Sequence, residues 1–127
     1  MTVAYWLVLV AAGLPYLFTC LAKFPGGRFG PNANKAPREF LAAQEGWQKR
    51  AHWAQLNSFE AFPAFAAAVI IAHQAGASQD YVNLLSAGFI ISRLVYGGFY
   101  LADIGVARSA AWGSGIACVV GLFVVSA

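Results

Sequence analysis

Residues 3–22 read VAYWLVLVAAGLPYLFTCLA and contain no charged side chain. A membrane-spanning helix needs about 20 mainly apolar residues to cross roughly 30 Å of hydrocarbon, and this stretch meets that requirement. Of the 127 residues, 60% are hydrophobic and only 10% are charged, against about 25% charged in a soluble domain. A soluble protein of this composition would expose a large contiguous apolar surface and aggregate. The chain is therefore expected to lie in a membrane.

Three further apolar segments follow the first one. They cover approximately residues 46–73, 81–101 and 107–125, and the polar segment 23–45 precedes them. Spans joined by very short turns run antiparallel to one another, and only short turns join the last three. The sequence therefore predicts one all-α domain over residues 1–127, an integral membrane four-helix bundle with antiparallel up-down topology.

The distribution of charge predicts the orientation of this bundle. Between residues 23 and 50, six basic side chains stand against two acidic ones, a net charge of +4. The turn between the second and third spans carries only Asp80. Because positively charged loops remain in the cytoplasm, the long loop is expected to be cytoplasmic and both termini to lie outside.

Several kinds of site are not supported by the sequence. No basic cluster is interleaved with aromatic residues on a soluble surface, so no nucleic-acid partner is expected. Cys20 and Cys118 both lie in apolar segments, without the spacing of metal ligands. We interpret them as buried small hydrophobic residues, with neither a metal site nor a disulfide.

Polar side chains recur at helical spacing inside two of the spans, where lipid burial should disfavour them. They are Arg50, Asn57 and Glu60 on the second span, and Arg93, Tyr96 and Tyr100 on the third. Spacings of three, four and seven residues place each set on one face of its helix. A polar stripe is therefore predicted where the second and third spans meet.

Counting both spans inward from the loop side predicts which residues share a depth. This register places Arg50 level with Asp103, Asn57 with Tyr96, and Glu60 with Arg93. A single charge near the bilayer midplane costs about 2.5–3.5 kcal/mol, so Glu60 and Arg93 are expected to face each other. Such a pair is seldom a net gain in stability, which favours a functional role. The alternative is that the pair only fixes the helix register.

Two stretches resemble the signatures of the MAPEG family (membrane-associated proteins in eicosanoid and glutathione metabolism). The stretch RAHWAQLNSFEAFP, residues 50–63, resembles the signature of the family's second helix through Arg50, Asn57, Glu60 and Pro63. The stretch RLVYGGFYLADIGVAR, residues 93–108, resembles that of the third helix through Arg93, Tyr96, Tyr100 and Arg108. Length, number of spans and the long first loop are also similar to the family, and the chain resembles its bacterial members.

The resemblance implies a homotrimer whose sites lie between neighbouring subunits and bind glutathione as a co-substrate. Its implied contacts are Arg50 and Arg93 with the carboxylates, Asn57 and Glu60 with the polar backbone and amino group, and Tyr96 and Tyr100 with the pocket wall. Arg108 is implied to be the catalytic residue that stabilises the thiolate. A nearby guanidinium lowers the pKa of a thiol, which is otherwise near 8.5.

The expected function is that of a glutathione- or thiol-dependent membrane transferase or peroxidase, acting on lipophilic electrophiles that arrive from the lipid. The alternative is a non-catalytic lipid-binding or scaffold protein on the same fold. Arg108 separates the two, because a scaffold has no need of a cation beside a thiol. The expected location is the inner or plasma membrane of a bacterium, with membrane lipid as a partner.

Overall fold

A computed structural model describes all of residues 1–127 and contains only helices and connecting segments. The elements are α1 (Val3–Lys23), the short 3-10 helix η1 (Ala33–Lys35), α2 (Pro37–Ala42), α3 (Gly46–Gln74), α4 (Gln79–Leu101) and α5 (Gly105–Val124). Four of them, α1, α3, α4 and α5, are long and apolar enough to cross a membrane. The predicted all-α fold with four membrane helices is confirmed.

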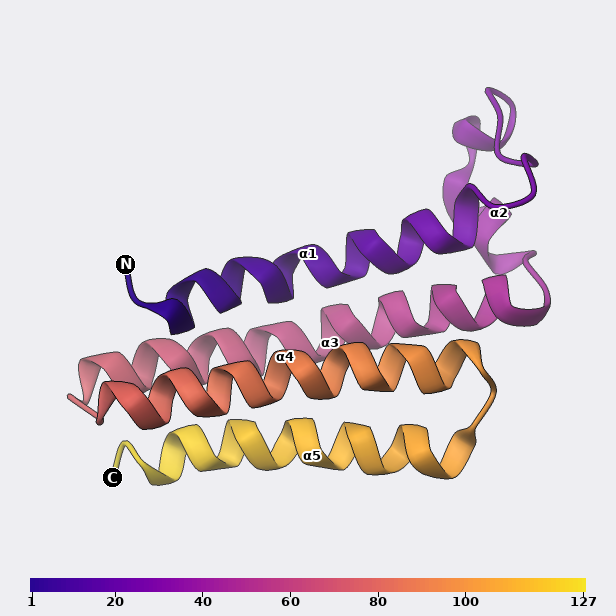
Figure 1. The fold of residues 1–127 in the computed structure, drawn as a ribbon. Helices are drawn as coiled ribbons and strands as arrows, with labels where there is room; N and C mark the ends of the chain where they lie inside the picture. The colour runs from indigo at the N-terminus through magenta and orange to yellow at the C-terminus, as the bar shows by residue number, and fades with distance from the viewer.

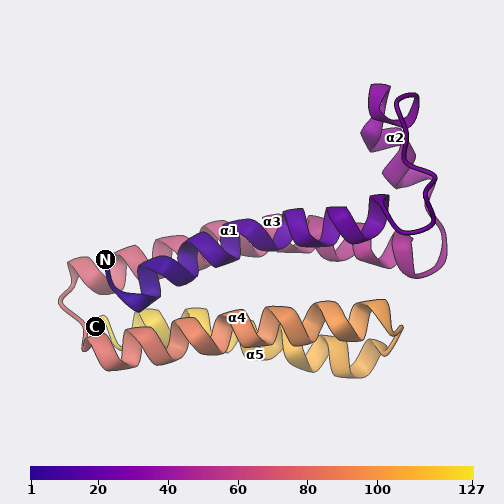
Figure 2. The same ribbon diagram turned by 45° about the horizontal axis from the view of Figure 1, so that its top comes forward.

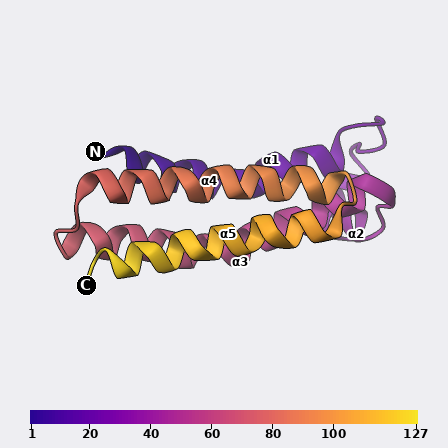
Figure 3. The same ribbon diagram turned by 60° about the horizontal axis from the view of Figure 1, so that its bottom comes forward.

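The four long helices lie side by side in two antiparallel pairs (Figure 1). Figure 2 shows α1 packed along α3, and α4 packed along α5. α3 and α4 are central, since each contacts all three other long helices (Figure 3). Both chain termini lie at one end of the bundle, the terminal end, and the segment with η1 and α2 projects at the other, the loop end (Figure 1).

Two tight turns reverse the chain between the last three helices. α3 ends at Gln74. Gly76 follows with a left-handed φ of 73°, and the N–H of Ala77 bonds to the carbonyl of Ala72 at 3.0 Å. This is the Schellman pattern, which glycine favours because it lacks a Cβ atom. α4 ends in the same way at Asp103, with φ 61°, a conformation that Asp and Asn tolerate better than other non-glycine residues. The short turns impose the antiparallel order.

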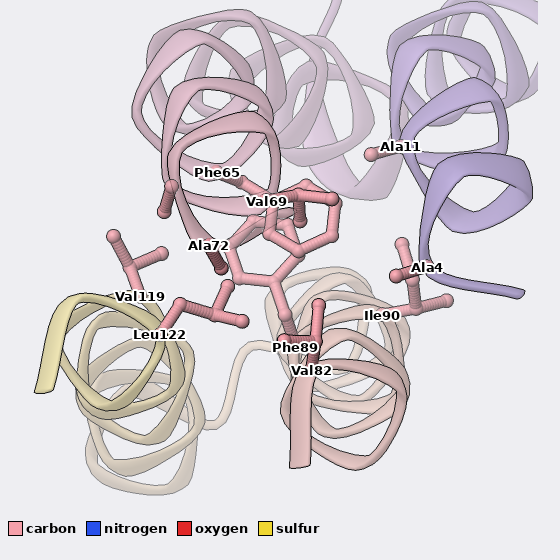
Figure 4. Packing of buried hydrophobic residues seen from close by; sticks show 11 residues of the cluster. Ala4, Ala11, Phe65, Val69, Ala72, Val82, Phe89, Ile90, Val119 and Leu122 are labelled. Atoms are coloured by element: carbon pink, nitrogen blue, oxygen red, sulfur yellow. The ribbon is translucent and has the colours of Figure 1, made fainter. Parts of the chain in front are cut away.

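The main apolar core occupies the terminal half of the bundle (Figure 4). At its centre the rings of Phe65 and Phe89 stack, with centroids 4.0 Å apart and planes 6° apart. Four of the core residues are alanines, which let the helix backbones approach closely. They are Ala4, Ala11, Ala68 and Ala72. The polar stripe predicted on α3 and α4 lies on the loop side of this core.

The contact between α4 and α5 depends on a glycine face. A Cβ atom added at Gly115 would lie 2.7 Å from Ser92 Oγ, and one added at Gly121 would lie 3.1 Å from Leu85. The sequence also carries small residues every four positions on α5, at Ser109, Gly113, Ala117 and Gly121. Of these, the first three are exposed. Residues four apart form a row that is inclined to the helix axis. This row therefore contacts α4 only near Gly121 and turns away from it toward Ser109.

Candidate functional site

A chain of hydrogen bonds joins α3 and α4 toward the loop end, and we call it the polar network. Arg93 Nη2 donates to Asn57 Oδ1 at 2.8 Å, and Asn57 Nδ2 donates to Glu60 Oε2 at 3.1 Å. The side chain of Arg93 is only 2% exposed, and its Nε is buried without a hydrogen-bond partner. Glu60 is exposed on the surface of the chain. The network therefore connects a buried cation to an accessible carboxylate.

The polar network differs from the predicted side-chain contacts. Glu60 was expected to face Arg93 directly, but Asn57 stands between them and bonds to both. The guanidinium of Arg93 lies 4.3 Å over the ring of Tyr96, the next turn of α4. The long arginine side chain therefore contacts Asn57 diagonally, one turn from its expected partner. Helix register gives the depth of each Cα atom, but the rotamer decides which side chains meet.

Beside the polar network the surface is hollowed into a cleft of about 390 Å³. Its lining residues are Trp53, Leu56, Asn57, Glu60, Tyr96 and Tyr100. The rings of Tyr96 and Tyr100 are perpendicular, with centroids 5.4 Å apart, and the ring of Trp53 lies 6.2 Å from that of Tyr100. Trp53 was not predicted to belong to the site. Its position four residues before Asn57 was the available signal, because that spacing places both on one helix face.

Arg108, in the first turn of α5, lies against Tyr100, which is one of the residues that line the cleft. Its guanidinium lies 4.5 Å over the ring of Tyr100, and its side chain is half-buried. A helix N-terminus carries partial positive charge and free N–H groups, so the start of α5 adds to the positive potential of the arginine. The positive charge next to Tyr100 is suited to an anion.

Arg50 occupies a different place from the other predicted site residues. Its Nε and Nη2 both donate to the carbonyl oxygen of Leu101, at 3.3 and 3.0 Å. This carbonyl is among the last of α4, which lack helical donors. Arg50 thus caps α4 at the loop end and does not line the cleft. Arg50 was expected to lie at the depth of Asp103, but it bonds to the backbone carbonyl of Leu101, two residues earlier in the chain.

An apolar groove of about 210 Å³ adjoins the cleft between α3 and α5. It shares Asn57 and Glu60 with the cleft, and is otherwise lined by Ala61, Ala64, Phe89, Trp112, Ile116 and Val119. The cleft and the apolar groove therefore meet at Asn57 and Glu60. No group of three or more His, Cys, Asp or Glu residues lies close enough together to hold a metal ion.

Comparison with known proteins gives one finding, which covers nearly the whole chain. The family model described as the MAPEG family matches residues 3–127. No curated protein and no solved structure matches the chain. The match agrees with the four membrane helices and supports a glutathione-related transferase, peroxidase or related membrane function in general. The chain therefore belongs to the MAPEG family and is a multi-pass integral membrane protein.

Proposed function

We propose that this protein is a thiol-dependent transferase or peroxidase that joins glutathione, or a related thiol, to lipophilic electrophiles. The observation that carries the proposal is the polar network beside the cleft, together with Arg108, whose guanidinium lies over the ring of the cleft residue Tyr100. Polar groups at membrane depth are costly, and Arg93 retains a buried, unpartnered Nε. Apolar side chains in the same place would stabilise the bundle without the desolvation of buried charges. The presence of the network therefore supports a role in binding a ligand.

The chemistry follows from where the charges lie. The thiol loses its proton to solvent, and the thiolate sulfur is stabilised by Arg108 and the start of α5. The sulfur then forms a bond with the electrophilic carbon, whose leaving group departs with the bonding electrons. With a hydroperoxide, the sulfur attacks the terminal oxygen, the O–O bond breaks, and the alkoxide leaves and takes a proton from solvent to become the alcohol. A second thiol reduces the resulting sulfenic acid and gives a disulfide.

The apolar groove supports a lipophilic second substrate. It adjoins the cleft at Asn57 and Glu60 and is otherwise mostly hydrophobic. An electrophile could place its apolar part in the groove with its reactive carbon toward the cleft. The two substrates would then meet at the boundary between the compartments.

The exposed position of Glu60 supports a homotrimer with sites between subunits. Its carboxylate lies in a membrane-length helix, yet it is exposed on a single chain. Facing lipid, a charge at the centre of a span costs about 2.5–3.5 kcal/mol, and a neighbouring subunit would shield it. Native mass spectrometry of the detergent-solubilised protein should therefore give a trimer mass.

The test is binding and turnover with purified oligomer. Calorimetry with glutathione should show saturable binding. Adding an apolar aryl chloride should release chloride and form a thioether that absorbs in the near ultraviolet. Binding without turnover of any electrophile or hydroperoxide would support the non-catalytic lipid-binding or scaffold alternative. Absence of thiol binding would contradict the proposal.

A further inference from the structure

One wall of the cleft is a row of α3 side chains, and Lys49 is the next position of that row toward the loop end. The α3 residues that line the cleft are Trp53, Leu56, Asn57 and Glu60. They follow Lys49 by four, seven, eight and eleven residues, spacings that keep side chains on one side of a helix. Lys49 lies in the first turn of α3, which begins at Gly46. It therefore stands where the cleft wall meets the loop end.

The ammonium of Lys49 extends along this row to the ring of Trp53. Its Nζ lies 5.4 Å from the ring centroid, within the roughly 6 Å range of a cation–π contact. The Trp53 ring lies 6.2 Å from that of Tyr100, and the guanidinium of Arg108 lies 4.5 Å over Tyr100. Two neighbouring rings of the cleft thus each have a cation beside them, one from α3 and one from α5.

The other basic side chains of α3 and α4 near the cleft are already bonded to the chain. Arg50 donates through Nε and Nη2 to the carbonyl oxygen of Leu101. Arg93 is only 2% exposed, and its Nη2 donates to Asn57. Lys49 is half-buried, and the three N–H donors of its ammonium make no hydrogen bond within the chain. Lys49 is therefore the cation of this wall whose whole charged group is free for a ligand.

The two ends of the α3 row carry opposite charges. The exposed carboxylate of Glu60 follows Lys49 by eleven residues, roughly 16 Å along the helix axis. The lysine ammonium sits on a flexible four-carbon stem and reaches from its own turn toward Trp53, which shortens this separation. The wall therefore complements an elongated ligand that carries an ammonium at one end and a carboxylate at the other.

We infer that Lys49 binds a carboxylate of the thiol substrate at the loop end of the cleft, the role that the sequence suggested for Arg50. The substrate then lies along α3, with its ammonium toward Glu60 and this carboxylate toward Lys49. In glutathione it is the glycine carboxylate, because the other carboxylate shares a carbon atom with the ammonium. The inference rests on the proposed function, since the ligand is the thiol substrate of that reaction.

The experiment compares glutathione with its glycine monoethyl ester. The ester lacks the charge of that carboxylate and keeps the thiol, the ammonium and the other carboxylate. In calorimetry on the purified wild-type oligomer, glutathione should bind about five- to twentyfold more tightly than the ester. This range lies between an exposed ion pair and a buried hydrogen bond to a charged group.

Two substitutions of Lys49 assign the effect to its ammonium. Lys49→Gln should weaken the binding of glutathione by the same factor and leave the affinity for the ester unchanged. Lys49→Met keeps an unbranched stem without the charge and should give the same result. The two variants change a surface position differently, so the test does not depend on the folding of either one.

Two control variants remove a positive charge at the loop end without touching this contact. Lys23 is matched to Lys49, because it is also half-buried and its Nζ also lies over a ring, that of Phe29 at 5.0 Å. Phe29 does not line the cleft, so Lys23→Gln should keep the wild-type preference for glutathione. Arg50→Gln should keep this preference too, although it loses the bonds to Leu101 and lowers thermal stability.

The outcomes separate this inference from the function on which it rests. Equal binding of glutathione and its ester to wild type would overturn the inference and leave the thiol site standing. A preference that survives in Lys49→Gln or Lys49→Met, or that is lost in Arg50→Gln, would also overturn it. If neither ligand binds to wild type, the proposed function itself fails.

Discussion

In the polar network, the side-chain amide of Asn57 uses its two ends for different partners. Its oxygen accepts from Arg93 and its nitrogen donates to Glu60. An aspartate could accept from the arginine but would have no donor for the carboxylate, and a leucine could do neither. The amide is therefore required to connect a buried positive charge with an exposed negative one.

The coupling between Glu60 and Arg93 should depend on Asn57. Each single change, Glu60→Ala or Arg93→Ala, should lower the unfolding free energy of the detergent-solubilised protein, and the double change should lower it by less than the sum of the two single changes. The expected coupling is about 0.5–3 kcal/mol, as for other residues in one network. The cycle repeated in an Asn57→Leu background should show a smaller coupling. An unchanged coupling there would mean that the two charges interact directly.

Arg108 should act on a bound thiol and contribute little to folding. Its guanidinium contacts the ring of Tyr100 at the edge of the cleft, where it would lower the pKa of the thiol. The ultraviolet absorbance of the thiolate, measured with glutathione at neutral pH, should fall in Arg108→Ala while thermal stability stays close to wild type. Arg108→Lys should restore little of the signal, because an ammonium lacks the planar geometry of the guanidinium.

A different explanation for Arg108 is an anchor to lipid phosphates. An anchor would accept lysine, and its loss would lower insertion or stability rather than the thiolate signal. Full thiolate absorbance in Arg108→Ala would therefore exclude the catalytic role.

At the scale of the elements, the pairing of α4 with α5 shows how side-chain size sets the distance between helices. Gly115 faces Ser92, whose Oγ also donates to the carbonyl of Phe89 at 2.7 Å. The hydroxyl is thereby held in the space that a Cβ at position 115 would need. Gly113, on the same helix, has nothing of the chain within 4 Å of such a Cβ.

Alanine in place of Gly115 and alanine in place of Gly113 should therefore have different effects on the free energy of unfolding. Gly115→Ala should destabilise the protein by about 1–3 kcal/mol, the range for overpacking. Ser92→Ala in the same protein should recover most of the loss, because it removes the conflicting hydroxyl. Gly113→Ala should be neutral or stabilising by up to about 1 kcal/mol through helix propensity. Thermal unfolding followed by circular dichroism measures all three. Equal losses of stability at both glycines would contradict the close contact between Gly115 and Ser92.

The long helices could be predicted from the sequence because each is an apolar segment of membrane length. The two short helices, η1 and α2, were not predicted, since three and six residues are too few to show a periodic pattern. Helical spacing in the sequence predicted which polar residues lie where α3 and α4 meet, namely Asn57, Glu60, Arg93, Tyr96 and Tyr100. It did not show that Arg50 caps α4, because a rotamer and a free carbonyl decide that contact. Of the small-residue row on α5, only Gly121 lies next to a side chain of α4, because small size alone does not decide which face of a helix packs.

For the whole molecule, the bundle has two different ends. At the terminal end the side chain of Thr2 bonds to Nε2 of His73 at 2.8 Å, and the ring of Tyr5 stacks on the same histidine at 4.0 Å. At the loop end Arg28 donates to Gln44 and Gln48 at 3.1 and 3.0 Å, which ties the long segment to α3. The cleft lies on the side of the loop end, so the orientation of the bundle decides which compartment supplies the thiol.

The last prediction is that the loop end faces the cytoplasm. The segment from residue 23 to residue 50 carries a net charge of +4, and the turn at the other end carries only Asp80. Basic loops remain inside because Lys and Arg near a span resist translocation. Single cysteines at Asn34 and Ser78, both exposed, would report the two ends once Cys20 and Cys118 are replaced. An impermeant maleimide added to intact cells should label position 78 and leave position 34 unlabelled.

Labelling after detergent treatment is the control for that experiment, since both positions should then react fully. Reaction of both positions in intact cells would contradict the arrangement of four spans. Reaction of position 34 alone would mean that the bundle has the opposite orientation, with the cleft toward the outside. A cytoplasmic thiol could not then reach Arg108 from its own compartment, and a ligand of the lipid or the exterior would have to occupy the cleft. The orientation of the bundle and the choice of ligand are thus linked by the position of the cleft near the loop end.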